Sequence, residues 1–321
     1  MNKTTKLWLI IATFILTLGL IIFVGAMATL KWDFTKLSTV KYETNSHEIT
    51  QAYDNISIVT GTADILLLPS ESENTQVVCH EQEKMKHSVT VKDGELSINA
   101  VDTRKWYDHI GINFDTSKIT VYLPQKQYGS LSVKTSTGDI SIPKEFAFKS
   151  ITLSASTGDV TNYASAAETV KITTSTGDIR VENTSCNALE LSLSTGRITV
   201  LNVACQNDVT VNVSTGKTSI TDMTCKSLIS NGSTGDISLT NVIASERFSI
   251  KRDTGDVNFD SCDAGEIFIK TSTGDIKGTL LSEKVFFYDT DTGRVDLPQT
   301  VTGGKCELTT NTGDIKIALN K

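Results

Sequence analysis

Residues 169–179 read TVKITTSTGDI, residues 188–198 read ALELSLSTGRI, and this pattern recurs along most of the 321-residue chain. A Thr-Gly pair returns ten times at intervals of 19 or 20 residues, with its glycine at positions 138, 158, 177, 196, 216, 235, 255, 274, 293 and 313. A degenerate eleventh copy, Thr60-Gly61, lies within ISIVTGTADILLLP. Self-similarity at a fixed period of this length indicates a repeat architecture.

Apolar and polar residues alternate within each repeat. Around Gly177, for example, Val170, Ile172 and Ile179 occupy columns that are mostly aliphatic in the other repeats, and the residues between them are mostly polar. Period-two alternation rich in β-branched residues predicts strands rather than helix. Two strands per repeat, paired in parallel with the next repeat, predict an all-β, right-handed parallel β-solenoid of about ten 19–20-residue coils.

The residues at each Thr-Gly pair fit a sharp corner. Glycine tolerates a positive φ, which a side chain would make costly. The residue two before the glycine is Ser, Asp or Asn in every repeat, and these types hydrogen-bond local backbone in turns. The Thr before the glycine is present in all ten copies and predicts a stacked row of hydroxyls.

The N-terminal segment predicts a transmembrane helix. Residues 7–30 contain no charge, and as a helix of about 36 Å they would cross a hydrocarbon core of about 30 Å. We expect residues 1–6 in the cytoplasm and the polar remainder outside the cell membrane, in a single-pass protein. The alternative is a signal peptide cleaved after Ala28, because Ala26-Met27-Ala28 fits a cleavage site and would give a secreted protein.

Between the helix and the repeats, two further regions are expected. Residues 31–48 predict a short stalk. Residues 49–130 predict a β-rich N-terminal cap that covers the first coil, because VTVKDGELSI at 89–98 has the Asp-Gly of a hairpin and ITVYLP at 119–124 is a strand ended by proline. The solenoid itself is expected over residues 131–321.

The order of these segments resembles a known family. NISIVTGTADILLL at 55–68, the KDGELSI hairpin, the ITVYLP strand and the STGDI repeats occur in one series. That series is similar to the "putative adhesin" domain-of-unknown-function family, which includes LiaG-like bacterial envelope proteins, and the likeness covers residues 49–321. The resemblance implies a β-solenoid, an exported or membrane-anchored location and an association with envelope-stress regulation. It implies no catalytic residues.

The residue after the repeat glycine forms an acidic row. It is acidic in seven repeats and basic in the other three, Arg197, Lys217 and Arg294. Stacked carboxylates could attract Ca²⁺, but turn capping with a solvated acidic edge is the reading we favour, and we expect no metal or cofactor. The members of the row are Asp139, Asp159, Asp178, Asp236, Asp256, Asp275 and Asp314.

The cysteines and histidines predict no ligand set. Nine residues after the glycine, successive repeats carry Ala147, Ala167, Cys186, Cys205, Cys225, Ala244 and Ala264. Alternation of Cys with Ala predicts a small buried position and packed free thiols rather than a disulfide. The four histidines have no metal-binding spacing and are expected at the surface.

Exposed aromatic residues are the better candidates for a binding site. Phe268 and Phe287 lie in an outward column of successive repeats and predict a stacked pair that could meet a sugar ring or a protein. Trp106 and Tyr107 lie in a loop-like run of the cap.

These features favour a binding or scaffold protein over an enzyme. The coils differ by one residue, which leaves no long loops to wall a catalytic cleft, so a polysaccharide-active β-helix enzyme is a remote alternative. The net charge of −9 over residues 31–321 argues against nucleic-acid binding. We expect an adhesin-like envelope protein that contacts wall glycan or another envelope protein. The alternative is an accessory of envelope-stress sensing that binds a membrane protein.

Overall fold

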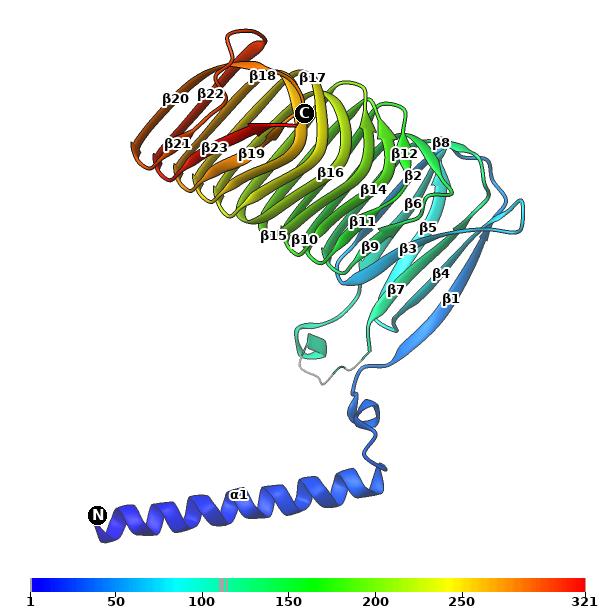
Figure 1. Cartoon of the computed structure of the whole chain (residues 1–321). Coiled ribbons are helices and arrows are strands. Elements are labelled where there is room, and N and C mark those ends of the chain that lie inside the picture. The colour runs from blue at the N-terminus through cyan, green and yellow to red at the C-terminus, as the bar shows by residue number, and fades with distance from the viewer. Residues whose placement is uncertain (1, 110–112, 114, 321) are drawn as a thin grey trace.

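A single long helix precedes the β-structure in the computed structural model, which describes residues 2–109, 113 and 115–320. Helix α1 (Lys3–Thr29) is long and apolar enough to cross a membrane, and apart from Met27 near its end its side chains are not buried by the rest of the chain (Figure 1). A single turn of 3-10 helix, η1 (Phe34–Leu37), follows it.

The end of the expected stalk belongs to the cap. Residues 42–48 were expected in the stalk but form most of strand β1 (Tyr42–Ile49), which pairs antiparallel with β4 (Thr75–Gln82). The inward positions of β1 include Asn45 and His47, so no apolar alternation marks this strand in the sequence. The half-buried Asn45 side chain finds a polar partner there, because its amide donates a hydrogen bond to the Glu81 carboxylate at 2.7 Å.

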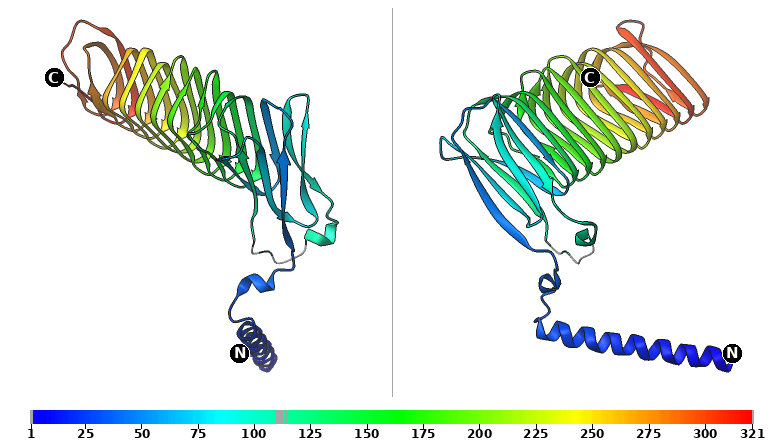
Figure 2. Two further views of the ribbon diagram at one scale, coloured as in Figure 1. Left: turned by 90° about the vertical axis from the view of Figure 1, so that its right-hand side faces the viewer. Right: turned by 180° about the vertical axis from the view of Figure 1, so that it is seen from behind.

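The cap closes one end of the solenoid with antiparallel strands (Figure 2). Strand β4 pairs antiparallel with β7, and β5 pairs antiparallel with β6 across the predicted hairpin, whose Asp93 and Gly94 both have positive φ. The first rung in sequence consists of β2 (Asn55–Thr60) and β3 (Ala63–Pro69). The remaining cap strands are β5 (Met85–Lys92), β6 (Glu95–Asp102) and β7 (Ser117–Leu123).

The repeats form a parallel β-solenoid of about ten turns, as predicted, and each turn is called a rung here. Strands stack in register, so that Leu189 lies beside Val209 and Ile198 beside Thr218. The strands of this region are β8 (Gln127–Thr137), β9 (Ile140–Ile142), β10 (Ala147–Thr157), β11 (Val160–Asn162), β12 (Ser165–Ala166), β13 (Thr169–Thr176), β14 (Ile179–Cys186), β15 (Ala188–Cys205), β16 (Asp208–Thr234), β17 (Ile237–Thr254), β18 (Val257–Thr273), β19 (Ile276–Leu280), β20 (Lys284–Thr292), β21 (Val295–Asp296), β22 (Gly304–Thr312) and β23 (Ile315–Leu319).

At both ends the rungs are stacked out of sequence order. The rung of β2 and β3, which contains Thr60-Gly61, lies between β6/β7 on one side and β8/β9 on the other. At the other end, β22 pairs with both β18 and β20, and β23 pairs with both β19 and β21. The last rung in sequence is therefore the second last in space, and β20 with β21 forms the outermost rung.

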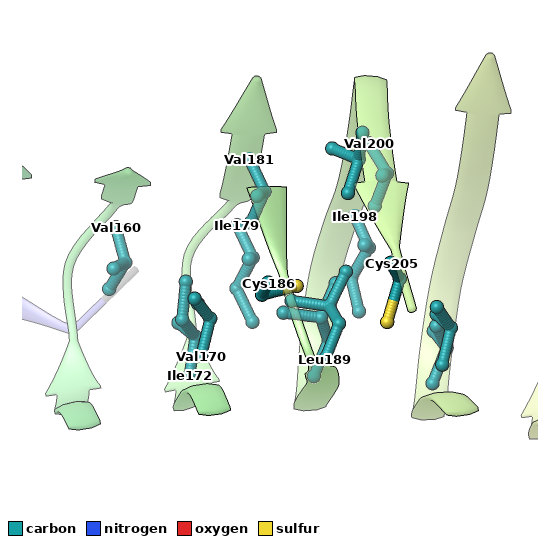
Figure 3. Packing of buried hydrophobic residues seen from close by; sticks show 14 of the residues in the cluster. Val160, Val170, Ile172, Ile179, Val181, Cys186, Leu189, Ile198, Val200 and Cys205 are labelled. Atoms are coloured by element: carbon teal, nitrogen blue, oxygen red, sulfur yellow. The ribbon is translucent and has the colours of Figure 1, made fainter. Parts of the chain in front are cut away.

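The predicted inward columns form one continuous core along the solenoid. Figure 3 shows Val170, Ile172 and Ile179 of one rung facing the same interior as Leu189 and Ile198 of the next. Each rung contributes its aliphatic side chains to the layer between its neighbours, so burial does not depend on long-range loops.

The cysteine column needs one correction. All six cysteines are buried and free, and Cys186 and Cys205 stack on adjacent rungs (Figure 3). Ala147 and Ala167, however, are exposed, and the inward positions of their rungs are taken by Phe148 and Ala166. In these two rungs the buried residue lies ten and eight residues after the repeat glycine instead of nine, so the buried column passes through a different sequence position.

The glycine corners are tight for two reasons. Nine of the ten repeat glycines have positive φ, between 124° and 154°, and Gly293 is the exception. In addition, a Cβ on Gly216 would lie 1.7 Å from the carbonyl oxygen of Gly196 on the neighbouring rung. A second corner, six residues after the glycine, holds Asn, Asp or Ser in the left-handed region from Asn183 to Ser261, and the sequence analysis did not single it out.

Candidate functional site

The acidic row lies along one edge of the solenoid and takes part in its hydrogen bonding. Asp139 accepts the backbone N–H of Asp159 at 2.8 Å, and Asp159 accepts that of Asp178 at 2.7 Å. Near the other end, Asp275 accepts the N–H of Asp314 at 2.7 Å, which follows the spatial rung order. The Lys277 ammonium and then this N–H lower the pKa of Asp275. These bonds use one carboxylate oxygen of each acceptor, and they supply no evidence of their own for an ion.

The aromatic pair is arranged differently from the prediction. Phe268 and Phe287 are not on adjacent rungs, because Glu307 of β22 lies between them. The Lys305 ammonium lies 5.3 Å from the Phe268 ring centroid and 5.4 Å from that of Phe287, and it pairs with Glu307 at 2.6 Å. The two rings are therefore joined through a cation instead of by stacking.

The outermost rung, which we call the distal end, exposes apolar side chains. Phe287 is 51% exposed, and Tyr288 and Val295 are 58% and 36% exposed although they occupy columns that are buried in the rungs beneath. Within the described residues, the outer edges of β20 and β21 pair with no further strand. At the distal end the columns that form the core are therefore exposed to solvent.

A polar groove runs across the middle rungs. It has a volume of about 470 Å³ and crosses five rungs on the strand face that precedes the glycine corner. Its walls are mostly hydroxyl and amide side chains, with Asn231 donating to Asn212 at 3.1 Å. The sequence analysis missed it, although Ser, Thr and Asn at the outward positions before each glycine were a usable signal.

Trp106 and Tyr107 lie on a short 3-10 turn, η2 (Trp106–His109), between β6 and β7. Trp106 is 77% exposed and Tyr107 48% exposed, and their rings meet edge to face at 5.8 Å. The η2 turn lies near the entry of the chain into the cap, at the opposite end of the β-structure from β18 and β20, which carry Phe268 and Phe287 (Figure 1). The structure therefore separates the two predicted aromatic candidates to opposite ends.

The cap also buries a cluster that the sequence analysis missed. The donor atoms of Cys79, Glu81 and His87 lie within 4.8 Å of one another. His87 was expected at the surface, yet its side chain is fully buried, with Nδ1 2.7 Å from Glu81 and Nε2 2.9 Å from Thr60. Burial and then the Glu81 charge raise the pKa of the Cys79 thiol to about 12.

This cluster fits a metal poorly. One oxygen of Glu81 accepts both the backbone N–H and the ring Nδ1 of His87, at 2.6 and 2.7 Å, and the other accepts from Asn45. An ion could bind only after the carboxylate–imidazole hydrogen bond was broken. The arrangement is that of a buried polar network whose carboxylate is already satisfied.

The family described as Toastrack DUF4097 matches residues 53–207 and 204–321. The chain belongs to the Toastrack family. The match begins just before β2 and so takes in the whole stack of rungs, while α1, η1 and β1 lie outside it.

Several solved structures share similarity with this Toastrack chain. A "putative adhesin" from Bacteroides fragilis is 17% identical, with 87% of this chain and 97% of that chain covered and a TM-score of 0.41. From Parabacteroides distasonis, a "putative lipid binding protein" is 16% identical over 86% and 97% of the chains, and a "putative adhesin" is 14% identical over 72% and 96%, both at a TM-score of 0.47. No curated protein matches the chain.

Proposed function

We propose that the protein is a non-enzymatic, membrane-anchored component of the bacterial cell envelope that presents its solenoid outside the membrane as an adhesin-like binding surface. The distal end is the observation that supports this proposal. It is the part of the solenoid opposite the cap, and it combines exposed aromatic side chains with unpaired strand edges.

In the part of the chain that the structure describes, the distal end leaves backbone hydrogen-bonding groups and apolar surface without partners. An edge strand offers a row of free N–H and C=O groups to an added strand. Exposed Phe287 and Tyr288 add apolar area beside that edge, and aromatic residues are enriched in binding surfaces. The ligand we propose is wall glycan or a surface protein that contacts this end.

Catalysis has no support in the described residues. The buried Glu81–His87 pair is closed to substrates, since neither side chain is more than 1% exposed. The rungs leave little irregular chain from which a cleft could be built.

The test is in-cell crosslinking of the full-length protein with a photoreactive residue at position 288. We expect adducts with wall material or a surface protein. The matched control carries the photoreactive residue at position 171, an exposed place in the middle of the solenoid, and should give few adducts. Equal capture from both positions would contradict a binding role for the distal end.

A second candidate function is an accessory role in envelope-stress sensing through a membrane protein. The exposure of Trp106 and Tyr107 at the cap favours it. A photoreactive residue at position 106 that captures one membrane protein, with none captured from position 288, would establish this role in place of the first.

A further inference from the structure

Exposed large apolar side chains outside α1 gather mainly at two places, and the distal end is one of them. The other is the region we call the cap base, formed by residues 30–41 and residues 103–109, which include η2. There Trp32 and Phe34 are 55% and 46% exposed, and Trp106 and Tyr107 are 77% and 48% exposed. The cap base thus presents four aromatic side chains to its surroundings, on the side where the chain comes from α1.

The η2 loop is held at this place by specific contacts. Lys84 pairs with Asp108 at 2.5 Å, and the Glu83 N–H donates to the Lys41 carbonyl at 3.1 Å. The Asn113 amide donates to the Tyr42 hydroxyl at 2.8 Å. These contacts tie η2 to the turn between β4 and β5, and they tie Asn113 and that turn to the start of β1, so η2 lies at the same end of the cap as the stalk (Figures 1 and 2).

The distance to the membrane is short. Only residues 30–41 separate the end of α1 from the start of β1, and twelve residues span at most about 40 Å even when fully extended. Part of that length is taken up by the turn of η1. If α1 spans the bilayer, the cap base lies close to its surface.

The chemistry of the cap base matches a lipid interface. Tryptophan and tyrosine are enriched where the headgroups meet the hydrocarbon, because an apolar ring with a polar edge suits that layer. Residues 30–41 carry Lys31, Lys36 and Lys41 against the single acid Asp33, in a chain that is otherwise acidic. Lysines close to an anionic membrane surface are attracted to it.

We propose that the cap base docks on the lipid surface beside α1, with the Trp106 and Tyr107 rings in the interfacial layer. This inference rests on the membrane anchor of the proposed function. Docking fixes the cap against the bilayer, so the solenoid is held at one inclination and does not swing freely on its stalk.

The three tryptophans of the chain allow a direct test. The full-length protein is placed in vesicles of phosphatidylcholine and phosphatidylglycerol with lipids brominated near the headgroup. The variant Trp8→Phe/Trp32→Phe leaves Trp106 as the single fluorophore. We expect the brominated lipid to remove most of the Trp106 emission, and unlabelled vesicles to show that emission at shorter wavelength than after denaturation.

Two controls separate docking from anchoring. A chain whose only tryptophan is Trp8 reports on the N-terminal end of α1, which lies at the edge of the uncharged stretch, and should be quenched by lipids brominated near the headgroup. A chain with Trp8, Trp32 and Trp106 replaced by Phe and with Phe287→Trp places the fluorophore at the distal end and should keep its emission.

The outcomes are distinct. Quenching of Trp8 without quenching of Trp106 would overturn docking and leave the anchor intact. No quenching of Trp8 would overturn the anchor and with it the inference. Quenching at Trp8 and Trp106, with none at position 287, supports docking on lipid, since these vesicles contain no partner protein.

Discussion

At the scale of single residues, two separate features of the structure require glycine at the corners, and they usually occur at the same residue. One is the positive φ, and the other is the approach of the neighbouring carbonyl where a Cβ would be. Gly61, in the degenerate copy, has neither: it has no positive φ, and a Cβ there would meet nothing within 4 Å. The sequence analysis identified the first requirement but could not show the second, which depends on the stacking of another rung.

Replacing Gly216 by alanine should therefore cost far more stability than replacing Gly61. We expect Gly216→Ala to lower the free energy of unfolding by more than about 2 kcal/mol, because strain in φ adds to a backbone overlap. Gly61→Ala should change it by less than about 0.5 kcal/mol. Urea unfolding followed by circular dichroism measures both, and similar losses for the two variants would show that the corner geometry is wrong.

At the scale of strands and rungs, the sequence determines what a rung looks like but not which rung lies beside which. The periodicity correctly predicted the strands, the inward columns and the parallel stack. All repeats share nearly the same pattern, so any rung fits on any other, and neither out-of-order end could be read from spacing. The same limit explains why Phe268 and Phe287 were expected on adjacent rungs.

Engineered cysteine pairs can test the rung order. Outward positions on neighbouring strands are about 5 Å apart, and positions two strands away are about 10 Å apart. We expect Phe268→Cys/Glu307→Cys to form a disulfide on mild oxidation and Phe268→Cys/Phe287→Cys to form none, because the second spacing is too long. Electrophoresis without reductant reads the result, and the reverse outcome would restore the order of the sequence.

At the scale of the whole molecule, the continuous core buries all six cysteines. Burial raises the pKa of Cys225 and Cys306 to about 12 and that of Cys262 to about 11, and together with the Glu81 charge it raises that of Cys79 to about 12. Whereas the hydrogen bond with Cys186 lowers the pKa of Cys205, the folded state thus favours the protonated thiol at these four positions. This stabilisation is complete below the ordinary thiol pKa of 9.0 and is lost as the pH rises towards 12.

Thiol labelling should follow this protection. We expect a maleimide to modify none of the cysteines in the folded protein at pH 7 and all six after denaturation, because all six thiols are buried in the folded state and out of reach of the reagent. Mass spectrometry counts the adducts. Labelling of Cys186 or Cys205 in the folded protein would show that the stacked cysteine column opens to solvent.

The out-of-order ends have a consequence for how the molecule comes apart. Repeat proteins depend on contacts between nearest neighbours, so a terminal repeat with one neighbour is the easiest to lose. Here the first and last rungs in sequence each have a neighbour on both sides. Neither of these rungs can therefore fray on its own, because each is clamped between two others and must wait until a neighbouring rung opens with it.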